Sequence, residues 1–167
     1  MSHRSPLRAH WLVPQTVDED AGGKSHGPYP PPRTSDQFLC VLIIEDNPGD
    51  MDLEEEMLSS DVDGSFSFVR ATTLAEGLAK LDEGVDVVVT NLGLPDIAGV
   101  GAVSTLLNHS PKVPVVVLTG CRCTRVWIAA FQAGAEDLLV KGTFDSERLK
   151  WVLRFAVERK RIETASR

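Results

Sequence analysis

Five polar residues that could do chemistry together each follow or end a strongly apolar run: Glu45, Asp46, Asn91, Thr119 and Lys141. Two adjacent carboxylates repel each other unless a cation or an ammonium group lies close by. Oxygen-rich clusters suit a hard cation such as magnesium, which uses one or two carboxylates and keeps several waters. If the fold brings the five together, they predict a site of two acids, an amide, a hydroxyl and an amine.

Asn91 holds the most informative position in this group. The β-branched run 87–90 that precedes it is typical of a buried parallel strand, which would deliver Asn91 to the carboxyl edge of a sheet. Ligands and reacting groups gather at that edge in open α/β sheets. A carboxamide is far less nucleophilic than a carboxylate, so we expect Asn91 to be chemically inert.

Five strand-then-helix repeats account for these positions. Apolar runs predict strands at 39–44, 65–68, 86–91, 114–120 and 137–142. Periodic segments predict the helices that follow them: after Pro48, after Thr73, at 97–107, around 126–134 and from 145 or 146 to about 162. This order predicts a doubly wound α/β fold, with a five-stranded parallel sheet, helices on both faces and right-handed crossovers.

The first helix has a clear predicted start and a predicted inner face. Asn47 is a suitable cap, with proline in the first turn. We expect Leu53, Met57 and Leu58 to face inward and the acids 54–56 to face mostly outward. In the second helix, the Thr73 and Glu76 spacing is that of a capping box.

Composition divides the 167 residues into an arm and a domain. Residues 1–36 are rich in proline and glycine and lack periodicity, which favours a disordered or loosely attached arm. Residues 37–162 form the predicted domain and 163–167 a short tail. The net charge of −7 argues against a nucleic-acid-binding face. No membrane span or secretory signal is visible, so we expect a cytoplasmic protein.

Three cysteines give no disulfide framework. Cys121 and Cys123 could supply two ligands to a metal. A structural zinc site needs four ligands, and no His or Cys cluster supplies the others, so we do not expect a metal there.

Four motifs in order, at 43–50, 92–96, 115–120 and 134–142, resemble the receiver domains of two-component response regulators, which have a flavodoxin-like fold. The resemblance covers about residues 38–160. It implies that Glu45 and Asp46, with Gly93, hold magnesium, and that Asn91 stands at the position of the phosphate-accepting aspartate. Thr119 and Lys141 would then contact a phosphoryl group.

Two departures from this family change the expected function. Asn91 cannot form an acyl phosphate and removes one charge from the metal site, so magnesium should bind weakly or not at all. Lys141 could then neutralise Glu45 and Asp46 without a metal. Leu138 stands where the family usually has an aromatic switch residue. Together these losses indicate a pseudo-receiver that acts without its own phosphorylation and without enzymatic activity.

The alternative is a conventional magnesium-dependent receiver in which another residue accepts phosphate. Asp96 and Thr90 are the two candidates. Asp96 lies past the turn, and Thr90 should point away from the site because side chains alternate along a strand.

The last predicted helix has two apolar stripes. One packs on the sheet, and the other contains Trp151, Phe155 and Ile162, with Lys150, Arg154 and Arg161 in the remaining sector. The aromatic residues either tuck against a neighbouring helix or form a partner surface. The resemblance implies dimers or output contacts here, so we expect a homodimer, a signalling kinase or an output protein as partner. Nucleic acid is not expected, because no helix-turn-helix follows.

Overall fold

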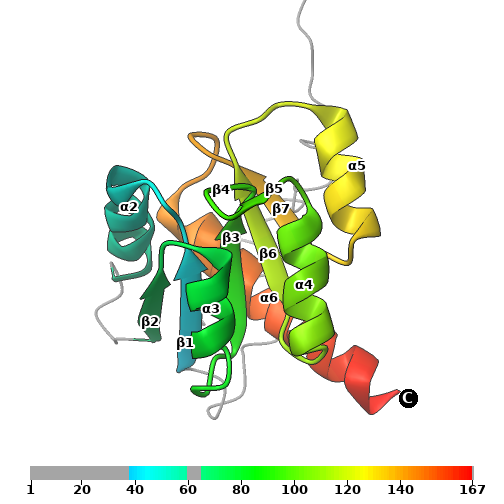
Figure 1. Cartoon of the computed structure of the whole chain (residues 1–167). Helices are drawn as coiled ribbons and strands as arrows, with labels where there is room; N and C mark the ends of the chain where they lie inside the picture. Colours follow the sequence, from blue (N-terminus) through cyan, green and yellow to red (C-terminus); the bar gives the residue numbers. More distant parts are fainter. Residues whose placement is uncertain (1–37, 60–64, 167) are drawn as a thin grey trace, which may run out of the picture. The chain divides into compact units, whose positions relative to one another are not determined.

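The computed structural model describes residues 38–59 and 65–166 (Figure 1). The predicted arm at residues 1–36 lies outside the described residues. Five parallel strands form the main sheet in the order β2-β1-β3-β6-β7. Their bounds are β1 Leu39–Ile44, β2 Phe66–Ala71, β3 Val87–Asn91, β6 Val115–Thr119 and β7 Asp137–Val140. The predicted doubly wound, five-stranded parallel α/β fold is therefore confirmed.

Helices cover both faces of this sheet. Their bounds are α2 Pro48–Ser59, α3 Leu74–Lys80, α4 Gly101–His109, α5 Thr124–Gln132 and α6 Ser146–Ala165. Helices α2 and α6 contact each other, whereas α3 and α4 lie side by side in front of the sheet in Figure 1. A right-handed crossover from β6 to β7 places α5 on the same face as α3 and α4.

The core lies along the three central strands. Residues 41–44 of β1, 87–88 of β3 and 115–117 of β6 are completely buried. The register pairs Val41 with Val87 and Val88 with Val115, so β-branched side chains stack from strand to strand. Strands buried on both faces read as continuous apolar runs, which is why the sequence indicated them clearly.

The predicted helix at 97–107 begins later than expected. Residues Gly93–Leu94 (β4) and Ile97–Ala98 (β5) form a small antiparallel hairpin, and α4 starts only at Gly101. Gly99 has a φ of 67°, a left-handed conformation that ends the hairpin and cannot continue a helix. Gly99 therefore precedes α4, and Gly101 begins it.

The predicted inner face of α2 is partly wrong. Glu54 is buried, with only 5% of its surface exposed, whereas Leu53 is 50% exposed. The buried positions are Met51, Glu54 and Leu58, which share one face because they are three and four residues apart. The apolar side chain of Leu53 suggested that it lies in the core, but the helical spacing buries Glu54 instead.

Side-chain caps begin α2, α3 and α6, whereas α4 and α5 have no side-chain cap, and the Glu76 carboxylate accepts from Thr72 in place of Thr73. Oδ1 of Asn47 accepts from the backbone N–H of Gly49 at 2.9 Å and of Asp50 at 3.1 Å. Thr73 caps α3 and Asp145 caps α6. Helix α6 continues to Ala165, three residues past the predicted end. No helix in the described part of the chain is long and apolar enough to cross a membrane.

Candidate functional site

Glu45 is the buried centre of the carboxyl edge of the sheet. It directly follows β1, and its side chain is 1% exposed. Its Oε1 accepts hydrogen bonds from the backbone N–H of Asn47 at 3.0 Å and from Nδ2 of Asn91 at 3.4 Å. Its Oε2 accepts from Nζ of Lys141 at 2.6 Å. Both carboxylate oxygens therefore have donors from within the protein.

Lys141 arrives from the end of β7 and joins two acids. Besides Glu45, its Nζ contacts Oδ2 of Asp50 at 2.8 Å. Burial alone lowers the pKa of Lys141, but hydrogen bonds and charges from Asp50 and Glu45 outweigh it and raise the pKa overall. The ammonium group therefore stays charged and acts as the fixed cation of this edge.

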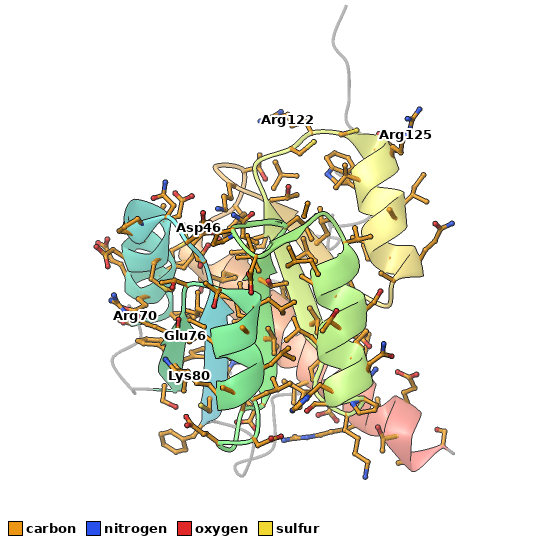
Figure 2. The ribbon with its side chains drawn as sticks, in the orientation of Figure 1. Asp46, Arg70, Glu76, Lys80, Arg122 and Arg125 are labelled. Atoms are coloured by element: carbon orange, nitrogen blue, oxygen red, sulfur yellow. The ribbon has the colours of Figure 1, made fainter. Side chains whose placement is uncertain are left out.

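The partner of Lys141 differs from the prediction. Asp50, in the first turn of α2, takes the place expected for Asp46. Asp46 is exposed, and Figure 2 shows it between α2 and the β4–β5 hairpin. Helical geometry explains the change, because Asp50 and Glu54 are four residues apart and share the face of α2 that lies toward Glu45.

Asn91 lies next to Glu45, as expected. Its Oδ1 accepts from the backbone N–H of Leu92 at 2.9 Å, and its Nδ2 points toward Glu45. A carboxylate here would place a second negative charge beside Glu45, where the carboxamide provides a hydrogen-bond donor instead. Asn91 therefore helps to satisfy Glu45 without a metal.

The two switch positions lie on adjacent strands. Thr119 ends β6 and is buried, and its Oγ1 accepts from the backbone N–H of Cys121 at 3.1 Å. Leu138 of β7 is 3% exposed and pairs in register with Val117. An isobutyl side chain cannot form a hydrogen bond, so Leu138 has no polar means of following a movement of the Thr119 hydroxyl.

Glu54 is a member of this group that sequence reasoning missed. Burial first, and then the charges of Glu45 and Asp50, raise its pKa to about 8, although Lys141 acts in the opposite direction. Its Oε2 is buried and has no hydrogen-bond partner among the described residues. At neutral pH the side chain is therefore mostly a neutral acid. The three- and four-residue spacing to Met51 and Leu58 was the signal that could have found it.

The expected magnesium ligands Glu45, Asp46 and Gly93 do not fit the ion in this arrangement. Glu45 already has donors on both oxygens, and the Lys141 ammonium lies between Glu45 and Asp50. A divalent cation would have to displace that ammonium against repulsion between like charges. Across residues 38–59 and 65–166, no group of three or more His, Cys, Asp or Glu side chains could hold a metal.

Both alternative phosphate acceptors are engaged elsewhere. The carboxylate of Asp96 accepts from the backbone N–H groups of Leu74 at 2.9 Å and Ala75 at 3.0 Å, at the start of α3. These bonds to Ala75 and Leu74 lower the pKa of Asp96. Thr90 is completely buried, and its hydroxyl donates to the carbonyl oxygen of Asn91 at 3.0 Å.

The strand order and the acid, hydroxyl and lysine at one edge define the class of CheY-like receiver folds. Residues 41–154 match the response regulator receiver domain family. The chain therefore belongs to that family. Receiver domains are signalling modules that interact with kinases and output proteins.

Curated relatives are similar at modest identity. The probable transcriptional regulatory protein TcrX of Mycobacterium tuberculosis is 28% identical over 136 residues, which cover 79% of this chain and 55% of the relative. The transcriptional regulatory protein GlrR of Escherichia coli is 31% identical over 102 residues, covering 60% and 22%. The two-component response regulator ARR2 of Arabidopsis thaliana is 28% identical over 146 residues, covering 86% and 20%. The chain thus spans about half or less of these relatives.

Solved structures agree on the fold. A response regulator receiver domain protein from Clostridium thermocellum is 25% identical with a TM-score of 0.66, covering 75% of this chain and 98% of that chain. The structure of NtrX from Brucella abortus in complex with ADP is 22% identical with a TM-score of 0.69, covering 77% and 29%. At these identities the likeness extends to the arrangement of the strands and helices.

Proposed function

We propose that this chain is a receiver module that signals by protein–protein contact without its own phosphorylation. The hydrogen bond from Nδ2 of Asn91 to Glu45 is the observation that carries the proposal. It supports the assignment of an inert carboxamide to the position where a receiver needs its nucleophilic carboxylate. The alternatives Asp96 and Thr90 are already engaged in hydrogen bonds, which leaves the edge without an acceptor that is both free and nucleophilic.

The charge balance supports the same function. In a metal-dependent receiver, acids at this edge bind a divalent cation. Here Lys141 bridges Glu45 and Asp50, and Glu54 has its pKa raised so that it stays mostly protonated near neutral pH. We infer that Lys141 takes the role of the metal by holding the acidic residues together. The carboxyl edge then holds one conformation without a bound metal, and the signal depends on the shape of the domain.

The phosphorylation test compares the chain with an Asn91→Asp variant. Each protein is incubated with acetyl phosphate and magnesium, and its intact mass is measured. We expect no phosphoryl adduct on the parent chain, because a carboxamide does not attack phosphorus. The variant regains a carboxylate at the site and is expected to gain a hydroxylamine-sensitive adduct.

The opposite pattern would overturn the proposal. An adduct of one phosphate on the folded parent chain would make it a conventional receiver. Peptide mapping would then identify the acceptor, with Asp96→Asn and Thr90→Val as variants that remove the two alternatives. An adduct that survives both substitutions still counts against the proposal, because it places acceptor chemistry at another residue of the edge.

The contact surface that we propose is the outer stripe of α6. Trp151 is 42% exposed and stacks on Phe155, with ring centroids 5.5 Å apart, and Ile162 is 60% exposed. Stacked aromatics cost little conformational entropy to bury, which suits them to an interface. The occupant that we propose first is a second copy of this chain, and a kinase or output protein is the alternative. The cytoplasmic location stays a prediction.

A further inference from the structure

Two cysteines lie together on the connection between β6 and α5. Cys121 and Cys123 are both exposed free thiols at the carboxyl edge of the sheet. One residue separates them, so the two thiols are neighbours on this exposed connection. The third cysteine, Cys40, is near the start of β1, at the opposite edge, where its backbone N–H donates to Asp86. The two exposed thiols therefore form a pair from which Cys40 is remote.

The surroundings of this pair favour a thiolate. Cys123 is the residue that precedes the first turn of α5. The backbone N–H groups of Val126 and Arg125 at this helix start are the main cause that lowers the pKa of Cys123, followed by Cys121 and the charge of Arg125. Arg122 and Arg125 also lie at this end of the molecule, with side chains pointing outward (Figure 2). Reactive cysteines are typical of exposed, electropositive surroundings of this kind.

The same loop is bonded to the switch position Thr119. The backbone N–H of Cys121 donates to Oγ1 of Thr119 at 3.1 Å. The carbonyl oxygen of Cys121 accepts from Nε1 of Trp127 at 2.9 Å. A change in the backbone at Cys121 therefore alters a hydrogen bond to Thr119 on one side and to α5 on the other.

Metal binding does not explain the pair. A thiophilic metal in a structural site needs four ligands, and the described residues place no third Cys, His, Asp or Glu within a metal-binding group here. Two neighbouring thiols are instead what thiol–disulfide chemistry requires, since one acts as nucleophile and the other resolves the product.

We propose that Cys121 and Cys123 form a reversible redox site, a dithiol that hydrogen peroxide converts into an intramolecular disulfide next to Thr119. The Cys123 thiolate attacks one oxygen of the peroxide, the O–O bond breaks, and sulfenic acid and hydroxide form. The Cys121 sulfur then attacks the sulfenic sulfur, the S–S bond forms, and a second hydroxide leaves. A proton from solvent and the proton of the Cys121 thiol convert the two hydroxides to water. In total the two sulfurs lose two electrons, and the peroxide gains them.

The short ring makes the site easy to reduce again. A disulfide that closes only three residues gains little from restricting the unfolded chain, so its stability depends on local geometry. Strained or exposed disulfides have more oxidising potentials and are the labile, regulatory ones. The redox state thus provides an input to the loop of Thr119 that does not depend on whether Asn91 accepts phosphate.

The first experiment maps the disulfide in the full chain. The reduced protein is titrated with hydrogen peroxide, and remaining thiols are counted with a maleimide reagent. Arg122 lies between the two cysteines, so trypsin separates them unless they are bonded. We expect two thiols to disappear together, peptides 113–122 and 123–125 to stay linked, and dithiothreitol to reverse both changes.

Three serine variants assign the roles. In Cys121→Ser, dimedone should trap a sulfenic acid on Cys123, because the resolving thiol is gone. In Cys123→Ser, oxidation should become several times slower, while Cys40→Ser should react like the parent. Oxidation of Cys40 at the same rate, or dimers joined between chains in place of linked peptides, would overturn the redox site.

The connection to Thr119 has its own readout. Amide resonances of Gly120 and Cys121 in ¹⁵N spectra should shift on oxidation and return on reduction, while those of β1 stay in place. Oxidation that leaves the Gly120 and Cys121 resonances unchanged would overturn the coupling. A circular dichroism spectrum equal to that of the parent serves as the check that each variant is folded.

Discussion

Glu54 is the residue whose environment departs most from what its chemistry favours. A carboxyl group that is 5% exposed, with Oε2 unpaired among the described residues, avoids the cost of a buried charge by keeping its proton. The groups that face it are Glu45, Asp50 and Lys141, and its pKa of about 8 follows from burial beside two acids and one base. The acidic edge therefore responds to pH within the physiological range.

A Glu54→Gln substitution should remove this pH dependence. The folded chain keeps the proton up to about pH 8, whereas the unfolded chain releases it near 4.5. Below pH 4.5 both states are protonated. As pH rises toward 8, the folded state binds more protons, so the free energy of unfolding falls, and it levels off above pH 8. The loss between pH 5 and pH 8 is up to roughly 4 kcal/mol.

Urea unfolding at several pH values measures this effect. The parent should lose stability from pH 5 to pH 8, and the glutamine variant should lose much less. Glu56→Gln changes an exposed acid two residues away and is the matched control, with a pH dependence like that of the parent. Equal pH profiles for the parent and Glu54→Gln would show that Glu54 ionises normally.

At the scale of elements, the turn after α5 fixes where β7 begins. Gly134 has a φ of 106°, and a Cβ built on it would lie 2.5 Å from Cδ1 of Leu107 on α4. This residue lets the chain leave α5 and enter the strand that carries Leu138 and ends beside Lys141. Only glycine adopts that conformation without strain while also leaving room for α4.

Gly134→Ala is expected to destabilise the domain by about 1–3 kcal/mol, because alanine at this φ is strained and its methyl group meets Leu107. Chemical denaturation monitored by circular dichroism measures the change. Gly120→Ala is the control, since Gly120 has no left-handed φ and, its chain neighbours aside, no described residue has an atom within 4 Å of an added Cβ. If both substitutions have the same small effect, the turn does not require glycine.

A single side chain connects the small hairpin to α3. Asp96 lies between β4 and β5, and its carboxylate accepts from the first backbone N–H groups of α3. Negative charge at a helix N-terminus is stabilised by the unpaired N–H groups there. The acid that seemed an alternative phosphate acceptor thus has a structural role, and the hairpin and α3 are held as one unit.

At the scale of the whole molecule, α6 has one face that packs on the sheet and another face that is exposed for contact with a partner. Its inner face holds Leu149, Val152, Leu153, Ala156 and Val157 against the sheet. Lys150 is also buried, which corrects its predicted place in an outer sector. The stacked pair of Trp151 and Phe155 lies outside this buried set and gives the molecule an apolar surface at one side.

Sedimentation velocity over a concentration series tests self-association through this surface. The sedimentation coefficient of the parent should rise with concentration, and that of Trp151→Ala should stay at the monomer value, because truncating an aromatic anchor removes most of an interface's binding energy. Leu53→Ala removes a comparably exposed apolar side chain on α2 and should behave like the parent. Parent and Trp151→Ala profiles that match at every concentration would remove the homodimer proposal.

Much of the site was predictable from local patterns. Continuous apolar runs identified the buried strands, and the polar residue after each run identified Glu45, Asn91, Thr119 and Lys141 as neighbours at one edge. This worked because parallel strands align their carboxyl ends, so position along each strand is enough to place its last side chain.

Side-chain pairing could not be predicted in the same way. Lys141 pairs with Asp50 and not with Asp46, and this pairing depends on the direction in which α2 leaves the sheet. The burial of Glu54 depends on that same helix packing beside α6. Both are long-range results of packing, and residue type at Leu53 and Glu54 indicated the opposite arrangement.

The sequence by itself determined the doubly wound α/β fold class, the edge of the sheet that carries the site, and the carboxamide at position 91. These follow from hydrophobic periodicity and from the chemistry of single residues. Only the tertiary structure decided which acids share Lys141 and which acid keeps its proton. Those properties depend on distances and on loss of water between segments that are remote in sequence, and a linear pattern carries no information on either.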